Sequence, residues 1–147
     1  MGIPTYQVGA FLRDPARRPD WAQLTRLAGD RAAIRFEALR RAISGIDGLV
    51  EELCYDGPDR GWVPRYRVGA IVLASVRISP GALEAAIELD GALRERVLES
   101  PRIAGSIKQA ILAAPVAGGA IQLRLRLSSL AQVRALARVM LEKSKAA

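Results

Sequence analysis

The most informative part of the chain is residues 49–90, which read LVEELCYDGPDRGWVPRYRVGAIVLASVRISPGALEAAIELD. β-branched and aromatic residues gather here in short segments, and Gly, Pro and Asp separate the segments. This pattern is typical of antiparallel strands joined by tight turns. We therefore expect strands at about 49–56, 62–68, 70–77 and 82–89. Their short connections predict a meander.

Two strands show an apolar face and a polar face. In the fourth strand, apolar residues at positions 83, 85, 87 and 89 alternate with Glu84 and Glu88. After Gly118-Gly119, the odd positions from Ile121 to Leu127 are apolar, and the positions between them are polar. Side chains of a strand point alternately to its two faces, so one face of the sheet should be buried against the core and the other exposed to solvent.

Helices are expected before and after the meander in the sequence. Asp20 and Gln23 form a capping-box pattern at the start of the first helix, and a second helix runs from residue 30 to about Ser44. Two further helices are expected between residues 90 and 115, and the last begins at Ser129. The element order ααββββααβα favours an α+β fold, an antiparallel meander of about five strands with helices packed on one face.

The length of 147 residues fits one domain over residues 1–147. Residues 1–18 are expected to be an arm packed on the body, with Tyr6, Val8 and Ala10 alternating as in a short strand. In the second and last helices, apolar residues recur at three- and four-residue intervals and predict one buried stripe on each helix. These residues are Ile34, Phe36, Leu39, Ala42 and Ile43, and then Leu130, Val133, Ala137, Met140 and Leu141.

The composition excludes several kinds of site. The chain has no histidine and a single cysteine, Cys54. Zinc fingers, Cys-His proteases and enzymes with a histidine acid or base are therefore excluded, and no internal disulfide can form. We see neither a secretory leader nor an apolar run near the ~20 residues of a membrane span, and expect a cytoplasmic protein with no membrane partner.

The richest local cluster lies over the first hairpin of the expected sheet and contains Tyr55, Asp56, Asp59, Arg60, Trp62, Arg65 and Tyr66. Tyr55, Trp62, Arg65 and Tyr66 are the candidate residues for binding a small ligand, because rings supply buried area and polar atoms fix orientation. Strand alternation places Trp62 and Tyr66 on one face and Arg65 on the other. The competing interpretation is that the two rings pack in the core.

Positive charge is concentrated at the end of the chain. The formal net charge is +7, and residues 100–147 contain eight Lys and Arg against one acidic residue. Arg124, Arg126, Arg134 and Arg138 are the candidates for contact with an anionic partner. A GC-rich genome would also explain an arginine excess. Asp56 and Asp59 are interpreted as turn formers, so no metal or cofactor is expected.

The chain resembles a bacterial family of small α+β proteins known as a domain of unknown function. The matching residues lie between about Phe11 and Lys143 and include a Gly-Trp pair. They are Pro19, Leu24, Leu27-Ala28-Gly29, Tyr55, Gly61-Trp62, Tyr66, Pro115, Gly118-Gly119 and Lys143. The resemblance implies an α+β fold akin to that of YdhG-like proteins, and it implies no catalytic residues.

Three functions follow as hypotheses. The first is a non-enzymatic module that binds a small ligand or a protein partner near Trp62. The second is a protein that binds nucleic acid or an acidic partner through its basic last third. The third is an enzyme that uses Asp, Arg and Tyr in place of histidine. An exposed sheet edge or apolar face would also favour a homodimer.

Overall fold

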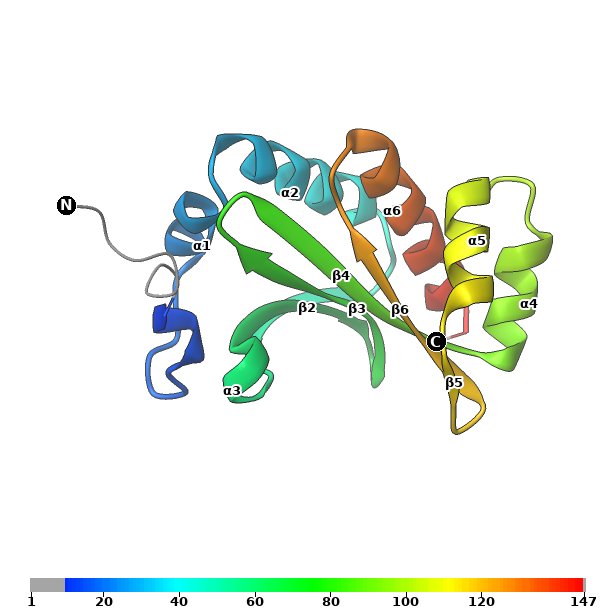
Figure 1. The fold of residues 1–147 in the computed structure, drawn as a ribbon, viewed down its shortest axis with the longest axis horizontal. Helices are drawn as coiled ribbons and strands as arrows, with labels where there is room; N and C mark the ends of the chain where they lie inside the picture. The colour runs from blue at the N-terminus through cyan, green and yellow to red at the C-terminus, as the bar shows by residue number, and fades with distance from the viewer. Residues whose placement is uncertain (1–9, 147) are drawn as a thin grey trace.

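The computed structural model describes residues 10–146, which form a six-stranded antiparallel sheet covered by helices (Figure 1). The helical elements are η2 (Ala10–Arg13), α1 (Trp21–Ala28), α2 (Asp30–Ile43), α3 (Gly57–Arg60), α4 (Gly91–Glu99), α5 (Gly105–Ala113) and α6 (Leu130–Ser144). The strands are β1 (Leu49–Tyr55), β2 (Trp62–Val68), β3 (Ile71–Ser79), β4 (Ala82–Asp90), β5 (Val116–Ala117) and β6 (Ala120–Arg126). The order in the sheet is β1-β2-β3-β4-β6-β5.

The α+β fold and its meander are confirmed. Strands β1 to β4 follow one another in space, and β6 pairs antiparallel with β4. The structure adds three short elements, the 3-10 turn of η2, the single turn of α3 and the two residues of β5. The sequence did not predict any of them, because four residues or two residues show no periodicity.

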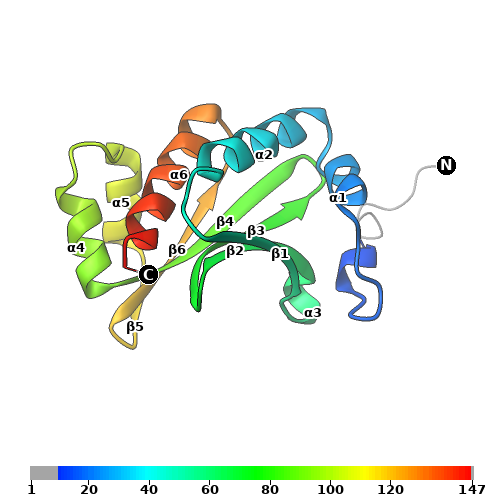
Figure 2. The ribbon, with the colours of Figure 1, turned by 180° about the vertical axis from the view of Figure 1, so that it is seen from behind.

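One face of the sheet is dry, as predicted. Leu83, Ile87 and Leu89 of β4 are buried, together with Ile121 and Leu123 of β6. Helices α1, α2 and α6 lie along this face, and α4 and α5 lie at the end reached by β4 and β6 (Figures 1 and 2). Each such aliphatic side chain stabilises the fold by about 1.5–3 kcal/mol relative to an exposed position.

The start of α1 also agrees with the sequence. The Gln23 N–H donates to Asp20 Oδ1 over 2.7 Å, and the Asp20 N–H donates to Gln23 Oε1 over 2.9 Å. This is the predicted capping box, which satisfies a backbone donor that the first turn cannot use internally.

The predicted stripes of α2 and α6 are wrong in part. Ile34 is 63% exposed, Leu130 is 46% exposed, and Ala42 is also exposed, whereas Phe36 and Leu39 are buried. The reason is that α2 and α6 lie side by side on the sheet, so each helix needs only a narrow face for the core. The outer flank of each stripe remains uncovered.

The N-terminal arm is described only from residue 10 onward, and Tyr6 and Val8 of the predicted strand lie outside the described residues. Ala10 belongs to the short 3-10 helix η2. No helix among residues 10–146 combines the length and the apolar character that a membrane span requires.

Candidate functional site

Two of the aromatic candidates hold the N-terminal arm. The Tyr55 hydroxyl donates to the Arg13 carbonyl oxygen over 2.7 Å, and the Trp62 indole N–H donates to the Asp14 carbonyl oxygen over 2.8 Å. The two rings meet edge to face, with centroids 5.7 Å apart. The polar atoms of both rings are therefore occupied by backbone of this chain.

The other two candidates lie on opposite faces of the sheet. Tyr66 is 1% exposed and packs among the core residues under the helices. Arg65 faces away from the helices, where its Nε and Nη2 donate to Glu52 Oε1 over 3.0 and 2.6 Å. Arg67 donates to the same oxygen. Burial, with the charge of Glu51 nearby, raises the pKa of the Tyr66 hydroxyl. The four predicted ligand residues thus do not converge.

The thiol and the carboxylates supply no evident reaction centre. Burial raises the pKa of Cys54, which disfavours the nucleophilic thiolate. Asp56 stands directly before α3 and Asp59 lies within it, in the link between β1 and β2. Within residues 10–146, no group of three or more Cys, Asp or Glu side chains is placed to hold a metal ion.

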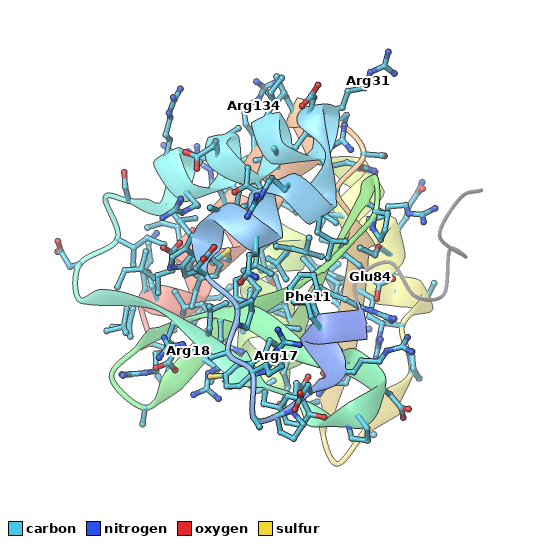
Figure 3. All side chains as sticks on the ribbon, turned by 90° about the vertical axis from the view of Figure 1, so that its left-hand side faces the viewer. Phe11, Arg17, Arg18, Arg31, Glu84 and Arg134 are labelled. Carbon is cyan, nitrogen blue, oxygen red and sulfur yellow. The ribbon has the colours of Figure 1, made fainter. Side chains whose placement is uncertain are left out.

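The four candidate arginines fall on two separate surfaces. Arg124 and Arg126 point away from the helices, and Arg124 Nη1 lies 3.6 Å from Glu84 Oε1. Arg134 and Arg138 lie on α6 and line a groove against α2. Figure 3 shows Arg134 on the helix layer and Glu84 below it, at the sheet. One ligand cannot contact both pairs without wrapping around the molecule.

The sheet opens between its two central strands. Pairing of β3 with β4 ends at Ser75 and Ala86, although β2 stays paired with β3 as far as Ile71. On the other side, β4 stays paired with β6 as far as Asp90. The two halves of the sheet therefore separate beyond Ser75 and Ala86, and a hollow of about 160 Å³ lies there. We call it the β3–β4 cleft.

The floor and the walls of the β3–β4 cleft differ in chemistry. Small residues form its floor near the point of separation: Ala74, Ser75 and Ala86. The rest of the lining is apolar at Val72 and Leu73, and it is polar or charged at Arg60, Glu88, Gln122 and Lys143. A hollow with a small floor and convergent polar groups has the character of a ligand site.

Lys143 crosses the opening from the helix side. Its ammonium donates to the Glu88 carbonyl oxygen over 2.6 Å, an acceptor that β3 leaves unused where the strands separate. Burial lowers the pKa of Lys143, and the charges of Glu88 and Asp90 oppose that shift. Lys143 is thus a partly desolvated cation beside the cleft.

Arg60 enters the cleft from α3. Its Nη1 lies 3.0 Å from Asp56 Oδ2, whereas its Nε and Nη2 are buried and have no hydrogen-bond partner among residues 10–146. Buried donors without a partner are rare in folded proteins, because each costs about 1–3 kcal/mol. An acceptor that reached Nε or Nη2 would remove this cost.

A second hollow adjoins the cleft. It has a volume of about 300 Å³, and Glu88 and Lys143 line both spaces. Its other walls include the apolar side chains of Ile71 and Leu93 and the charged side chains of Asp90 and Arg96. Together the two hollows reach the size of known small-molecule sites, about 300–1,000 Å³.

Neither cation was among the four ligand candidates predicted from the sequence. Arg60 belonged to the cluster of the first hairpin but lies in the link that we interpreted as a turn, and Lys143 appeared only among the residues of the family resemblance. The available signal was the occurrence of small residues, Ser75 and Ala86, on adjacent central strands. Their meaning depends on the register, which the sequence does not supply.

In comparisons with protein-family models, with curated proteins and with solved structures, the chain matches none of them. The resemblance to the domain-of-unknown-function family therefore stays a prediction, and the function must be argued from the site alone.

Proposed function

We propose that this chain is a non-enzymatic module that binds a small anionic molecule, carrying a carboxylate or a phosphate, in the β3–β4 cleft. The observation that carries the proposal is the guanidinium of Arg60, with two buried donors unpaired, in the same cleft as Lys143. Arg60 would bind the anion through its fork of N–H groups, and Lys143 would act as a point charge.

The remaining side chains suit recognition. Gln122 can donate and accept hydrogen bonds, and the Ser75 hydroxyl lies at the floor. The carboxylate of Glu88 would repel a second negative charge and would favour a ligand with a donor group beside its acid. The cleft thus fits a small polar anion better than an apolar compound.

This proposal retains the small-ligand hypothesis and moves the site away from Trp62. The indole N–H of Trp62 already donates to Asp14, and Tyr66 is enclosed by the core. The alternative of a nucleic-acid surface loses support because Arg124 and Arg126 lie far around the molecule from Arg134 and Arg138.

Calorimetric titration tests the proposal. Inorganic phosphate and a panel of small mono- and dicarboxylic acids are added to the wild-type protein and to the variants Arg60→Gln and Lys143→Met. We expect at least one probe to bind, and each variant to weaken it about tenfold or more, because each loses a charge-assisted hydrogen bond. The better probe class distinguishes a carboxylate ligand from a phosphate ligand.

Two further variants control this experiment. Arg126→Gln and Lys145→Met remove exposed positive charges outside the cleft and should leave the affinity unchanged. Ala86→Leu fills the floor and should abolish binding without a change in charge. The site would be refuted if Arg126→Gln weakened binding as much as Arg60→Gln does. It would also be refuted if Ala86→Leu left binding intact, since the anion would then bind elsewhere.

A further inference from the structure

The outer flank of the helix layer carries a second surface, unrelated to the β3–β4 cleft. Ile34 and Leu130 are exposed although the periodicity of their helices predicts burial. Both lie in one hollow of about 460 Å³ between α2 and α6, together with Ala38 and Arg41. Large aliphatic side chains on the apolar stripe of a helix usually have something packed against them.

A second hollow continues the first along the same two helices. It has a volume of about 400 Å³, and small or apolar residues form much of its lining: Ala42, Gly45, Ile46, Ala137 and Leu141. The two hollows make one groove, which we call the α2–α6 groove. Since α2 has 14 residues, the groove spans about 21 Å at 1.5 Å per residue, the length of a four-turn helix.

Three arginines and one glutamate line the groove. Arg41, Arg134 and Arg138 supply positive charge, and the carboxylate of Glu37 is paired with Arg40 over 2.9 Å. A second copy of this chain would bring two faces with the same excess of arginine together across a two-fold axis, at a cost in repulsion. A flat bilayer would not fill a hollow between two helices. The groove shape and the charge fit an acidic helix.

We propose that the α2–α6 groove docks an amphipathic, acidic helix of a partner protein. The aliphatic side chains of that helix would lie between α2 and α6 over Ile34 and Leu130. Its carboxylates would face Arg41, Arg134 and Arg138. Helix-in-groove recognition of this kind places apolar anchors at every third or fourth residue and sets specificity through flanking charges.

The test is selection from a displayed library of amphipathic helices of about four turns. Inward positions are aliphatic, and each flanking position is Glu or Lys at random. We expect selected clones to carry Glu at the flanks. A labelled peptide from them should show, by fluorescence anisotropy, about tenfold or greater loss of affinity for Ile34→Ser and for Leu130→Ser. Arg134→Glu with Arg138→Glu should reverse the preference towards Lys.

Leu112→Ser and Arg102→Glu are the matched controls, because Leu112 and Arg102 are exposed and lie away from the groove. Both should leave the affinity unchanged. All replaced side chains reach solvent, so circular dichroism should show folded variants. Three results would overturn the proposal: no clones, or clones with Lys as often as Glu; a wild-type dimer in light scattering that Leu130→Ser dissociates; or binding only to anionic lipid vesicles through the same residues.

Discussion

Two guanidinium nitrogens of Arg60 are buried and have no hydrogen-bond partner among residues 10–146. The Nε atoms of Arg35 and Arg94 are also buried and unpaired there, but neither residue lines the β3–β4 cleft. A residue kept for stability would be expected to use its donors within the fold. A residue kept for a ligand holds them free until the ligand arrives, and the folded state carries the cost. These two interpretations predict opposite effects of replacing Arg60.

Arg60→Met should raise the free energy of unfolding by about 1 kcal/mol, because the loss of two unsatisfied donors outweighs the loss of the ion pair with Asp56. Urea unfolding measures this change. The anion probes that raise the melting temperature of the wild-type protein should no longer do so for this variant. A fall in stability of similar size would instead make Arg60 a structural anchor.

On the sheet face away from the helices, Glu52 should make the stability of the protein depend on pH. Hydrogen bonds from Arg65 and Arg67 hold the pKa of Glu52 below its usual value. Because the pKa of Glu52 is lower in the folded state, its ionised carboxylate contributes to the free energy of unfolding. This contribution is present above the unfolded-state pKa and is lost as the pH falls through the folded-state pKa. Glu52→Gln should therefore destabilise the protein at neutral pH and make little difference in strong acid.

Urea unfolding of the wild-type protein and of Glu52→Gln, at neutral and at strongly acidic pH, measures how much Glu52 contributes to the free energy of unfolding. Glu84→Gln is the control, since the only ion pair of Glu84 among residues 10–146 is with Arg124, at 3.6 Å. Its effect at neutral pH should be smaller. A stability difference for Glu52→Gln that persists unchanged in acid would contradict the account.

Among the elements, the link between β1 and β2 is the one whose role the sequence concealed. Its Gly, Pro and Asp residues indicated a turn, and the structure shows α3, a turn whose last residue is Arg60. Beside it, η2 packs on α3, and Gly61 allows the close approach. A short turn therefore places the cleft's main cation and also fixes the arm.

Gly61→Ala tests that contact. Gly61 has φ +68°, and a Cβ atom there would lie 2.2 Å from the Leu12 carbonyl oxygen. We expect the free energy of unfolding to fall by more than about 2 kcal/mol, since the backbone must leave the left-handed region or the arm must move. Gly81→Ala is matched in φ, at +72°, but has open space around the new Cβ. Thermal unfolding should show a smaller loss for Gly81→Ala, of about 1 kcal/mol.

Equal losses for the two glycine variants would mean that the contact with Leu12 has no energetic weight. Limited proteolysis provides a second measurement. The bonds between residues 12 and 18 should be cut faster in Gly61→Ala than in Gly81→Ala, because only the first change displaces the arm from α3.

For the whole molecule, the sequence predicted the α+β architecture because alternation and helical periodicity are properties of neighbouring residues. Ile121, Leu123 and Leu127 face the core as the period of two requires. Periodicity does not say how much of a stripe the neighbouring helix covers, so Ile34 and Leu130 were predicted to be buried and are exposed.

The candidate site could not be predicted in this way. It depends on where the pairing of β3 with β4 stops and on side chains from α3 and α6, which lie 83 positions apart in the sequence at Arg60 and Lys143. Tyr55 and Trp62 attracted attention as aromatics, but their polar atoms bind the backbone of the arm. The residue types showed that Tyr55 and Trp62 can form hydrogen bonds, but they did not show which group accepts those bonds.

The most direct measurement is a crystal structure of the protein grown with the probe that binds best in the calorimetric panel. We predict that the acid group of that probe lies in the β3–β4 cleft, accepts hydrogen bonds from Nε or Nη2 of Arg60 and is within reach of the Lys143 ammonium. A probe found at any other surface, with the Arg60 donors still unpaired, would contradict the claim that the separation of β3 and β4 makes a binding site.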